Sequence, residues 1–314
     1  MVTANNLVKT YGKKNEILAV DHVSFSVSDG EIFGLIGPDG AGKTSIFRML
    51  TTLLLPDGGS ATVEGFDVVK DYKQIRNTVG YMPGKFSLYQ DLSVEENLNF
   101  FATVFGTTIK ENYDLIKEIY VQLEPFKKRR AGKLSGGMKQ KLALCCALIH
   151  KPTVLFLDEP TTGVDPVSRK EFWEMIGRLK VQGITILVST SYMDEAGLCD
   201  RIALMQSGKI LSIDTPENMS ASYTDKLVAV MANKMTTLLK ALSKFPKAVN
   251  SYAFGEYAHI TIENAESAVD DVGNVSANGT LNIENEIKNY LEKQGLENIE
   301  VKPIKATIED CFIK

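Results

Sequence analysis

A glycine-rich segment near the start of the sequence has the residue types and the spacing that bind a phosphate chain. It matches the pattern G-x-x-x-x-G-K-[ST] and runs Gly37-Pro38-Asp39-Gly40-Ala41-Gly42-Lys43-Thr44, with Ser45 following. Backbone N–H groups of such a loop surround the phosphates, the lysine reaches the β and γ phosphates, and the threonine hydroxyl holds Mg²⁺. Asp39 would bring a carboxylate close to an anion, so we expect its side chain to point away. The sequence therefore predicts a site for a nucleoside triphosphate with Mg²⁺.

A second group of reactive side chains follows an apolar segment. Asp158 and Glu159 come directly after Val154-Leu155-Phe156-Leu157. In this arrangement one carboxylate can hold Mg²⁺ while the other lies at the water that attacks the γ-phosphate. Buried strands often end in acidic residues, so the pair indicates this chemistry only in combination with the phosphate loop.

The elements that must position these residues alternate between strands and helices. Apolar alternation predicts strands, and a period of three to four residues predicts helices. Ser93 with Glu96 three residues later predicts a capped helix start. In chain order we expect strands at 17–27 and 31–36, helices at 93–105, 112–123 and 135–150, a strand at 153–157, a helix at 166–180 and a strand at 184–188. This order is typical of an α/β domain with a mainly parallel sheet, here over residues 1–220, with an all-helical insert at about 86–150.

The pattern changes after residue 220. Strands are expected at 226–232, 249–254, 257–263 and 297–304, with helices at 236–245 and 283–294. The order βαββαβ is that of a ferredoxin-like α+β domain, which we assign to residues 225–314. Residues 264–279 are polar and rich in small side chains, which predicts a mobile loop between the hairpin and the second helix.

Composition and charge argue against several classes of protein. The 314 residues include 35 basic and 39 acidic side chains, a net charge of -4, which disfavours a nucleic-acid partner. Four cysteines, two of them adjacent at Cys145 and Cys146, give neither a disulfide framework nor a metal-ligand spacing, so we expect a reducing compartment. No apolar run approaches the ~18 residues of a membrane span, so we expect any work at a membrane to go through a partner.

A third motif lies at the start of the helix expected at 135–150. It reads Leu134-Ser135-Gly136-Gly137, after the phosphate loop and before the two acids. With these three motifs in this order, the chain resembles the ATP-binding subunits of ABC transporters, most strongly over residues 3–219. The residues Ser135-Gly136-Gly137 resemble the signature sequence of that family. The sequence from Gly163 to Trp173 resembles that of the drug-exporter branch of the family.

The resemblance implies a cofactor, a dimer and further site residues. It implies that the bound nucleotide is ATP with Mg²⁺, and that Tyr11 stacks on its adenine. Ser135, Gly136 and Gly137 would grip the γ-phosphate of ATP held by the phosphate loop of an opposite subunit, where the helix dipole favours an anion. Asp165 would lie in the loop that links the two sites of the dimer.

Two positions depart from the family's pattern. The family usually has glutamine at the place of Gly84, touching Mg²⁺ and the attacking water. It usually has histidine at the place of Ser191, contacting the γ-phosphate; this is the family's switch position, and residues 190–192 are termed the switch segment. Glycine has no side chain to ligate, and serine is short and neutral. Either Gln90 or water supplies the missing contacts, or this site binds ATP and hydrolyses it poorly. In the second case the chain's signature completes a competent site on a sister subunit.

Together the motifs and the resemblance imply an ATPase subunit of an exporter, with Lys43, Asp158, Glu159 and Ser191 as the expected catalytic residues. Such a subunit works in the cytoplasm on the inner face of the cell membrane. It drives separate permease subunits, expected to dock around Gly84–Gln90, together with a second ATP-binding subunit. One alternative is a soluble ABC-type ATPase acting on DNA or ribosomes, although the coiled-coil insertions or second cassette of such proteins are missing. Another is a regulatory module that binds ATP without hydrolysing it.

Overall fold

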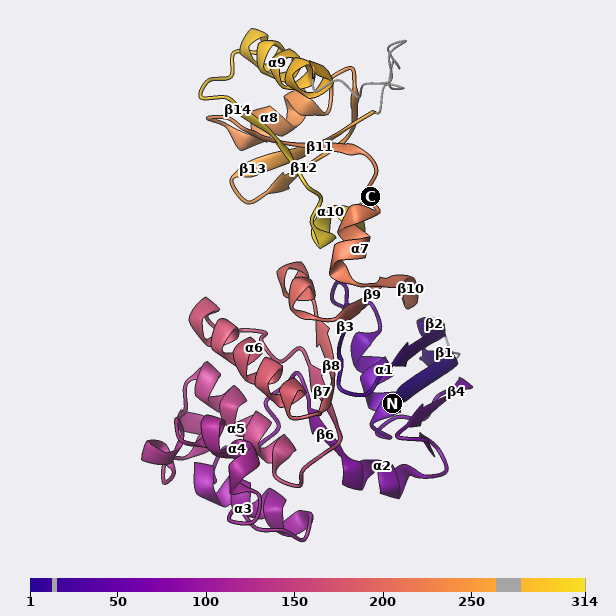
Figure 1. Ribbon diagram of the computed structural model, residues 1–314, viewed down its shortest axis with the longest axis vertical. Coiled ribbons are helices and arrows are strands. Elements are labelled where there is room, and N and C mark those ends of the chain that lie inside the picture. Colours follow the sequence, from indigo (N-terminus) through magenta and orange to yellow (C-terminus); the bar gives the residue numbers. More distant parts are fainter. Residues whose placement is uncertain (13–15, 264–277, 314) are drawn as a thin grey trace. The chain divides into compact units, whose positions relative to one another are not determined.

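The computed structural model describes residues 1–12, 16–263 and 278–313 of the chain (Figure 1). The chain divides into two compact units, Met1–Pro216 and Glu217–Lys314. Within the described residues, no helix is both long enough and apolar enough to cross a membrane.

A six-stranded sheet with the order β10-β9-β3-β8-β7-β6 forms the centre of the first unit. Its strands are β3 (Ile32–Ile36), β6 (Val79–Met82), β7 (Val154–Asp158), β8 (Thr185–Thr190), β9 (Arg201–Gln206) and β10 (Lys209–Asp214). Every pairing is parallel except that of β9 with β10. Strands β3, β7 and β8 are buried along their whole length, as is typical of parallel strands that are covered on both faces. The expected mainly parallel sheet is confirmed.

A second sheet, with the order β2-β1-β4-β5, is antiparallel. It contains β1 (Val2–Tyr11), β2 (Ile17–Val27), β4 (Gly58–Val63) and β5 (Phe66–Asp67). The strand expected at 17–27 belongs to this sheet, whereas β1 was not predicted. The alternation of β1 breaks because its pairing with β2 shifts register between Ala4 and Leu7, and Asn6 there adopts a φ of 49°.

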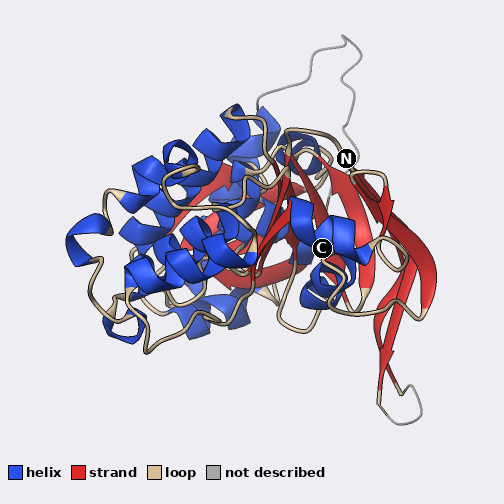
Figure 2. Ribbon diagram, turned by 90° about the horizontal axis from the view of Figure 1, so that it is seen from below, coloured by secondary structure: helices blue, strands red, loops and turns tan. Residues whose placement is uncertain are grey.

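Six α-helices of the first unit surround the sheets. They are α1 (Lys43–Leu50), α2 (Tyr72–Thr78), α3 (Val94–Val104), α4 (Tyr113–Tyr120), α5 (Gly136–Leu148) and α6 (Pro166–Val181). Helices α3 and α4 contact α5 and form the expected helical insert, on the side of the unit away from the antiparallel sheet (Figures 1 and 2). The predicted cap of α3 is confirmed, because Ser93 Oγ accepts from Glu96 N–H and Glu96 Oε2 accepts from Ser93 N–H.

The hydrophobic core of the first unit joins the antiparallel sheet, α1 and the parallel sheet. Phe25 of β2 stacks on Phe33 of β3 at 5.4 Å between ring centroids. Phe47 of α1 meets Phe156 of β7 edge to face at 5.6 Å. Because these rings are buried, they fix α1 and the ends of β3 and β7, the elements that carry the predicted site.

The second unit has the predicted ferredoxin-like order. It contains β11 (Lys226–Met231), α8 (Met235–Leu242), β12 (Ala248–Phe254), β13 (Tyr257–Ile262), α9 (Asn278–Lys293) and β14 (Glu300–Ile304). The strands lie in the order β12-β13-β11-β14, with every neighbouring pair antiparallel. Of the loop expected at 264–279, residues 264–277 lie outside the described part of the chain, and Asn278 begins α9.

Two short helices of the second unit were not predicted, α7 (Pro216–Ala221) and α10 (Ile308–Ile313). Buried Asp310 of α10 accepts hydrogen bonds from Tyr252 Oη at 2.6 Å and His259 Nδ1 at 2.7 Å. These bonds fasten the end of the chain to the β12–β13 hairpin. Chain-local patterns give no sign of such a contact, because its partners lie more than fifty residues apart.

Candidate nucleotide site

The phosphate loop connects β3 to α1, and its glycines are required by their surroundings. Gly42 has a φ of 104°, and a Cβ there would lie 2.3 Å from the carbonyl oxygen of Ala19. A Cβ on Gly37 would lie 2.2 Å from the carbonyl oxygen of Met205. Any other side chain would collide with the backbone, so the spacing seen in the sequence keeps this turn tight and its N–H groups accessible.

Lys43 lies across the loop and is 4% exposed. Its ammonium group donates to the carbonyl oxygens of Gly37 at 2.6 Å and Pro38 at 3.1 Å. It also forms an ion pair with Glu159, with 2.9 Å between Nζ and Oε1. Lys43 and Glu159, more than a hundred residues apart in sequence, are thereby brought together. Asp39 is exposed.

Asp158 sits at the end of β7 and is almost fully buried. Its Oδ1 accepts from Thr44 Oγ1 at 3.1 Å and from Ser189 Oγ at 2.6 Å. Burial is the largest influence on Asp158 and raises its pKa, against the opposing effect of these two hydrogen bonds. Tyr81 lies beside it, and burial together with the charge of Asp158 raises the pKa of Tyr81 to about 12. The hydroxyl and carboxylate oxygens of Thr44 and Asp158 are ligands that suit Mg²⁺.

Glu159 is held on several sides. Its backbone has a φ of 49°, a strained conformation for a residue with a side chain. Its N–H donates to both the carbonyl oxygen and the hydroxyl of Ser189, each at 3.0 Å. Its Oε2 accepts from the backbone N–H of Ser191 at 3.2 Å and from the Ser191 hydroxyl at 3.4 Å. The predicted switch residue therefore reaches Glu159, with its backbone making the shorter contact.

Gly84 lies directly beside the two acids. A Cβ at this position would lie 3.1 Å from the carbonyl oxygen of Asp158 and 3.4 Å from Cβ of Glu159. Next to it is a cavity of about 150 Å³ that Gly84, Glu159 and Gln140 help to line, and Gln140 Oε1 is buried with no hydrogen-bond partner. Gln90 is exposed, and its backbone accepts from the Gly132 N–H.

Tyr11 lies at the end of β1, beside the start of α1. Its hydroxyl is 3.1 Å from Ser45 Oγ. The ring is partly exposed, with the ammonium group of Lys9 5.9 Å from its centroid. The position next to the loop and the open ring face are what stacking on a base requires.

The signature residues lie at the N-terminus of α5, next to that of α6. Ser135 caps α5, since its Oγ accepts from the Met138 N–H at 3.3 Å. A Cβ on Gly137 would lie 2.7 Å from Ser168 Oγ, so only glycine allows this approach. Asp165 caps α6 by accepting from the Ser168 N–H at 3.0 Å, and this hydrogen bond lowers its pKa. Ser135 and Gly136 are exposed, as a contact with another subunit requires.

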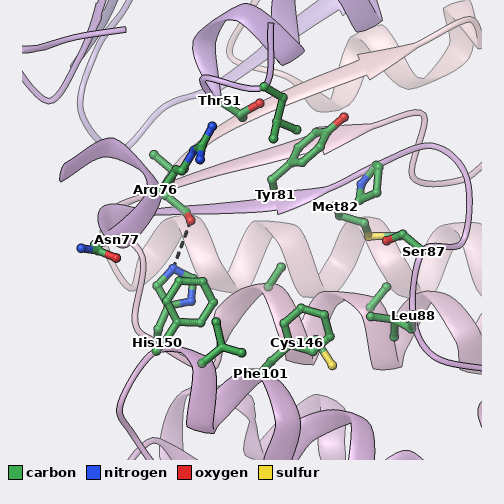
Figure 3. Close-up of a pocket in the computed structure, with 17 residues that line it drawn as sticks. Thr51, Arg76, Asn77, Tyr81, Met82, Ser87, Leu88, Phe101, Cys146 and His150 are labelled. Atoms are coloured by element: carbon green, nitrogen blue, oxygen red, sulfur yellow. Dashed lines mark hydrogen bonds between the residues drawn. The ribbon is translucent and has the colours of Figure 1, made fainter. Parts of the chain in front are cut away.

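A groove of about 430 Å³ lies where the helical insert meets the parallel sheet (Figure 3). Tyr81 and Met82 face Phe101, Cys146 and His150 across it. His150 Nε2 lies 3.0 Å from the Val79 carbonyl oxygen, and its ring stacks on Phe105 at 3.8 Å. Burial lowers the pKa of His150, and its Nδ1 is buried with no hydrogen-bond partner.

Comparison with known proteins identifies the family. A family model described as ABC transporter matches residues 20–162. The doxorubicin resistance ATP-binding protein DrrA of Mycobacterium tuberculosis (strain CDC 1551 / Oshkosh) is 38% identical over 240 residues, which cover 76% of this chain and 72% of DrrA. The chain belongs to the ABC transporter family. This agrees with the resemblance drawn from its motifs.

Two further matches extend the comparison. The probable multidrug ABC transporter ATP-binding protein YbhF of Escherichia coli (strain K12) is 40% identical over 288 residues, 90% of this chain. That match covers 49% of YbhF, so the chain spans about half the length of this relative. A solved ATP-binding subunit of an ABC transporter superposes with a TM-score of 0.64 at 26% identity, over 71% of this chain and 93% of that one.

Sequence reasoning missed three polar residues of this ABC cassette. Ser189 bonds to both acids, Gln140 lines the cavity at Gly84, and Glu195 is buried behind the switch segment. Ser189 had a local signal, since it occupies the end of an apolar strand as Asp158 does. Gln140 and Glu195 had none, because polar residues at these positions also occur on solvated helix faces.

Proposed function

We propose that this chain is the ATP-binding subunit of an exporter. It binds MgATP, closes as a head-to-tail dimer with a second ATP-binding subunit, and drives transport through membrane permease subunits from the inner face of the membrane. The observation that carries the proposal is the convergence of Lys43, Thr44, Asp158 and Glu159 around one glycine-rich loop. The names of DrrA and YbhF refer to drug resistance and multidrug transport, which supports drugs as the class of transported substrate.

The geometry suggests what each group does. In this chain Lys43 is paired with Glu159, and phosphates entering the loop would compete for the same ammonium group. Loss of the ion pair with Lys43 would free Glu159 to orient water. Thr44 and Asp158 would hold Mg²⁺. Tyr11 would stack on the adenine. The loop from Gly37 to Ser45 would surround the phosphates with backbone N–H groups.

The proposed dimer gives a second duty to the signature residues. Ser135 and Gly136 are exposed at the start of α5, so they can meet ATP bound by the sister subunit. Asp165 lies beside them through its bond to Ser168 and is available as a link between the two sites.

We further propose that the chain's own site hydrolyses ATP slowly. Gly84 leaves a cavity where a glutamine side chain would reach Mg²⁺ and water. Ser191 is too short to reach past Glu159 toward a γ-phosphate, and it contacts the carboxylate instead. In a heterodimer with a competent sister subunit, the chain's signature residues would contact the ATP that the sister subunit hydrolyses.

The groove at the helical insert is the proposed contact with the permease. Ser87 and Leu88, within the Gly84–Gln90 segment, line it together with apolar side chains of α3 and α5 (Figure 3). A helical segment of a permease subunit, apolar on one face, would fill such a groove. Its position next to Gly84 would connect movement of the permease to the nucleotide site.

Nucleotide binding by the purified chain tests the proposed function. Lys43→Ala removes a charged donor, and loss of such a hydrogen bond is worth about 1.5–3 kcal/mol, so MgATP affinity should fall about 10- to 100-fold. Lys110→Ala, which removes an exposed lysine from the helical insert, is the matched control and should bind like the wild type. Unchanged affinity of the Lys43→Ala variant would contradict the site.

A further inference from the structure

A buried carboxylate behind the switch segment connects three elements of the cassette. Glu195 is 1% exposed and accepts hydrogen bonds from Thr161 Oγ1 at 2.7 Å, Thr190 Oγ1 at 2.7 Å and Arg169 Nε at 3.2 Å. Thr161 follows β7, Thr190 ends β8 and Arg169 belongs to α6. These four residues form what we call the Glu195 cluster. Burial of a carboxyl group costs less when hydrogen-bond donors surround it, and these three side chains supply such donors.

Both ends of the Glu195 cluster adjoin the proposed catalytic acid. Thr161 is two residues after Glu159, and Thr190 directly precedes Ser191, whose N–H donates to Glu159 Oε2. Thr190 Oγ1 also accepts from the Tyr192 N–H at 3.0 Å, so its hydroxyl connects the backbone directly after Ser191 to Glu195. The cluster is therefore joined, through Thr190, to the segment that carries the Ser191 N–H.

This matters in a chain with serine at the switch position. The shorter contact from the switch segment to Glu159 is made by the Ser191 backbone, and the segment's placement decides whether that contact forms. We propose that Glu195 is a positioning residue that holds the Ser191 N–H against Glu159, and that it acts through the hydroxyl of Thr190. The inference rests on the proposed function, because it concerns hydrolysis at this site.

A neighbouring ion pair provides a contrast. Asp194 also binds Arg169, at 2.9 Å, but its side chain is 72% exposed and its partner guanidinium is shared with Glu195. Exposed pairs of this kind contribute little to stability or geometry. The charge on Arg169 alone therefore does not account for the cluster, whose contacts with Thr161 and Thr190 come from Glu195.

The test compares Thr190→Val with Thr190→Ser in the full chain. Valine keeps the shape of the side chain and removes the hydroxyl, whereas serine keeps the hydroxyl. With the chain in excess over radiolabelled MgATP, we expect the single-turnover rate at saturation to fall about 10-fold in Thr190→Val and to stay within about twofold of the wild type in Thr190→Ser. Glu195→Gln should also be slower, and Asp194→Asn should behave like the wild type.

Binding and folding are measured on the same samples. The affinity for MgATP should stay within about twofold of the wild type in Thr190→Val, since no proposed phosphate contact is removed. The chain's single tryptophan, Trp173, lines the same pocket as Arg169 and Glu195, so an unchanged emission maximum checks local folding.

The outcomes separate the inference from the proposed function. A wild-type chain that turns over no bound ATP contradicts the proposed hydrolysis, and the inference with it. A wild type that hydrolyses ATP no faster than Thr190→Val overturns the inference alone. The same holds if Thr190→Ser loses as much activity as Thr190→Val, or if the loss lies in affinity and not in rate.

Discussion

Gly84 and Ser191 occupy the two positions at which the sequence departs from the pattern expected of ABC ATPases. Gly84→Gln with Ser191→His should raise steady-state phosphate release by the purified chain at least 10-fold, since one preorganised contact is typically worth about 10²-fold. The cavity beside Gly84 leaves room for the new side chain. The Asp158 carbonyl must shift by a few tenths of an ångström to accommodate its Cβ. Wild-type release as fast as that of the double variant would contradict the proposed slow site.

Asp158 gives a prediction on stability and pH. Burial raises its pKa, so the folded chain binds more protons than the unfolded chain between the ordinary aspartate pKa and the raised value. Its contribution to the unfolding free energy therefore falls as the pH rises through that window. Asp158→Asn removes the buried charge and should raise the melting temperature at pH 7 by about 2 °C without nucleotide.

Two controls accompany this melting experiment. The gain from Asp158→Asn should shrink as the pH is lowered, because a growing fraction of the wild-type carboxyl is then protonated. Added MgATP should stabilise the wild type more than the variant, because the variant lacks the carboxylate proposed to hold Mg²⁺. A lower melting temperature of Asp158→Asn at pH 7 would contradict the prediction that the buried carboxylate destabilises the folded chain.

At the scale of elements, the junction of α5 and α6 depends on a glycine. In Gly137→Ala the new Cβ would lie 2.7 Å from Ser168 Oγ and 3.0 Å from its Cβ, so the two helix ends must separate. We expect the unfolding free energy to fall by about 1–2 kcal/mol in chemical denaturation, as for other overpacked sites. Gly136→Ala, whose Cβ comes no closer than 3.8 Å to Gly163, should cost much less. Equal losses in both would show that the contact with Ser168 is unimportant.

Elements with a strong local pattern were predictable from the sequence. The Ser93 cap, the strands β7 and β8 and the order of the second unit followed from periodicity and cap residues. Strand β1 was missed because its irregular pairing at Asn6 interrupts the alternation of its side chains.

The site was predictable only as far as its motifs extend. The phosphate loop and the two acids have fixed spacing, so their residues could be named in advance. The sequence does not show why glycine is required in this loop. Gly37 lies against Met205 and Gly42 against Ala19, and these contacts join segments that are distant in sequence. Glu195 depends on three partners from separate elements, and no local pattern records such a buried carboxylate.

At the scale of the whole molecule, the two compact units have separate hydrophobic cores. The residues of the proposed nucleotide site all belong to the first unit. We propose that residues 1–220 and 225–314 act as two domains, with the second at the dimer seam or in a regulatory role.

The central claim is that the chain's own site mainly holds ATP while its signature serves a sister subunit. ATPase activity of the transporter reconstituted with its native partners tests it most directly, with Glu159→Gln compared against Ser135→Arg. We predict that Glu159→Gln slows the complex only modestly, whereas Ser135→Arg nearly abolishes hydrolysis by putting a bulky cation where the sister's γ-phosphate is gripped. Losses of equal size from the two substitutions would show that this site is catalytic and that the two sites are not unequal.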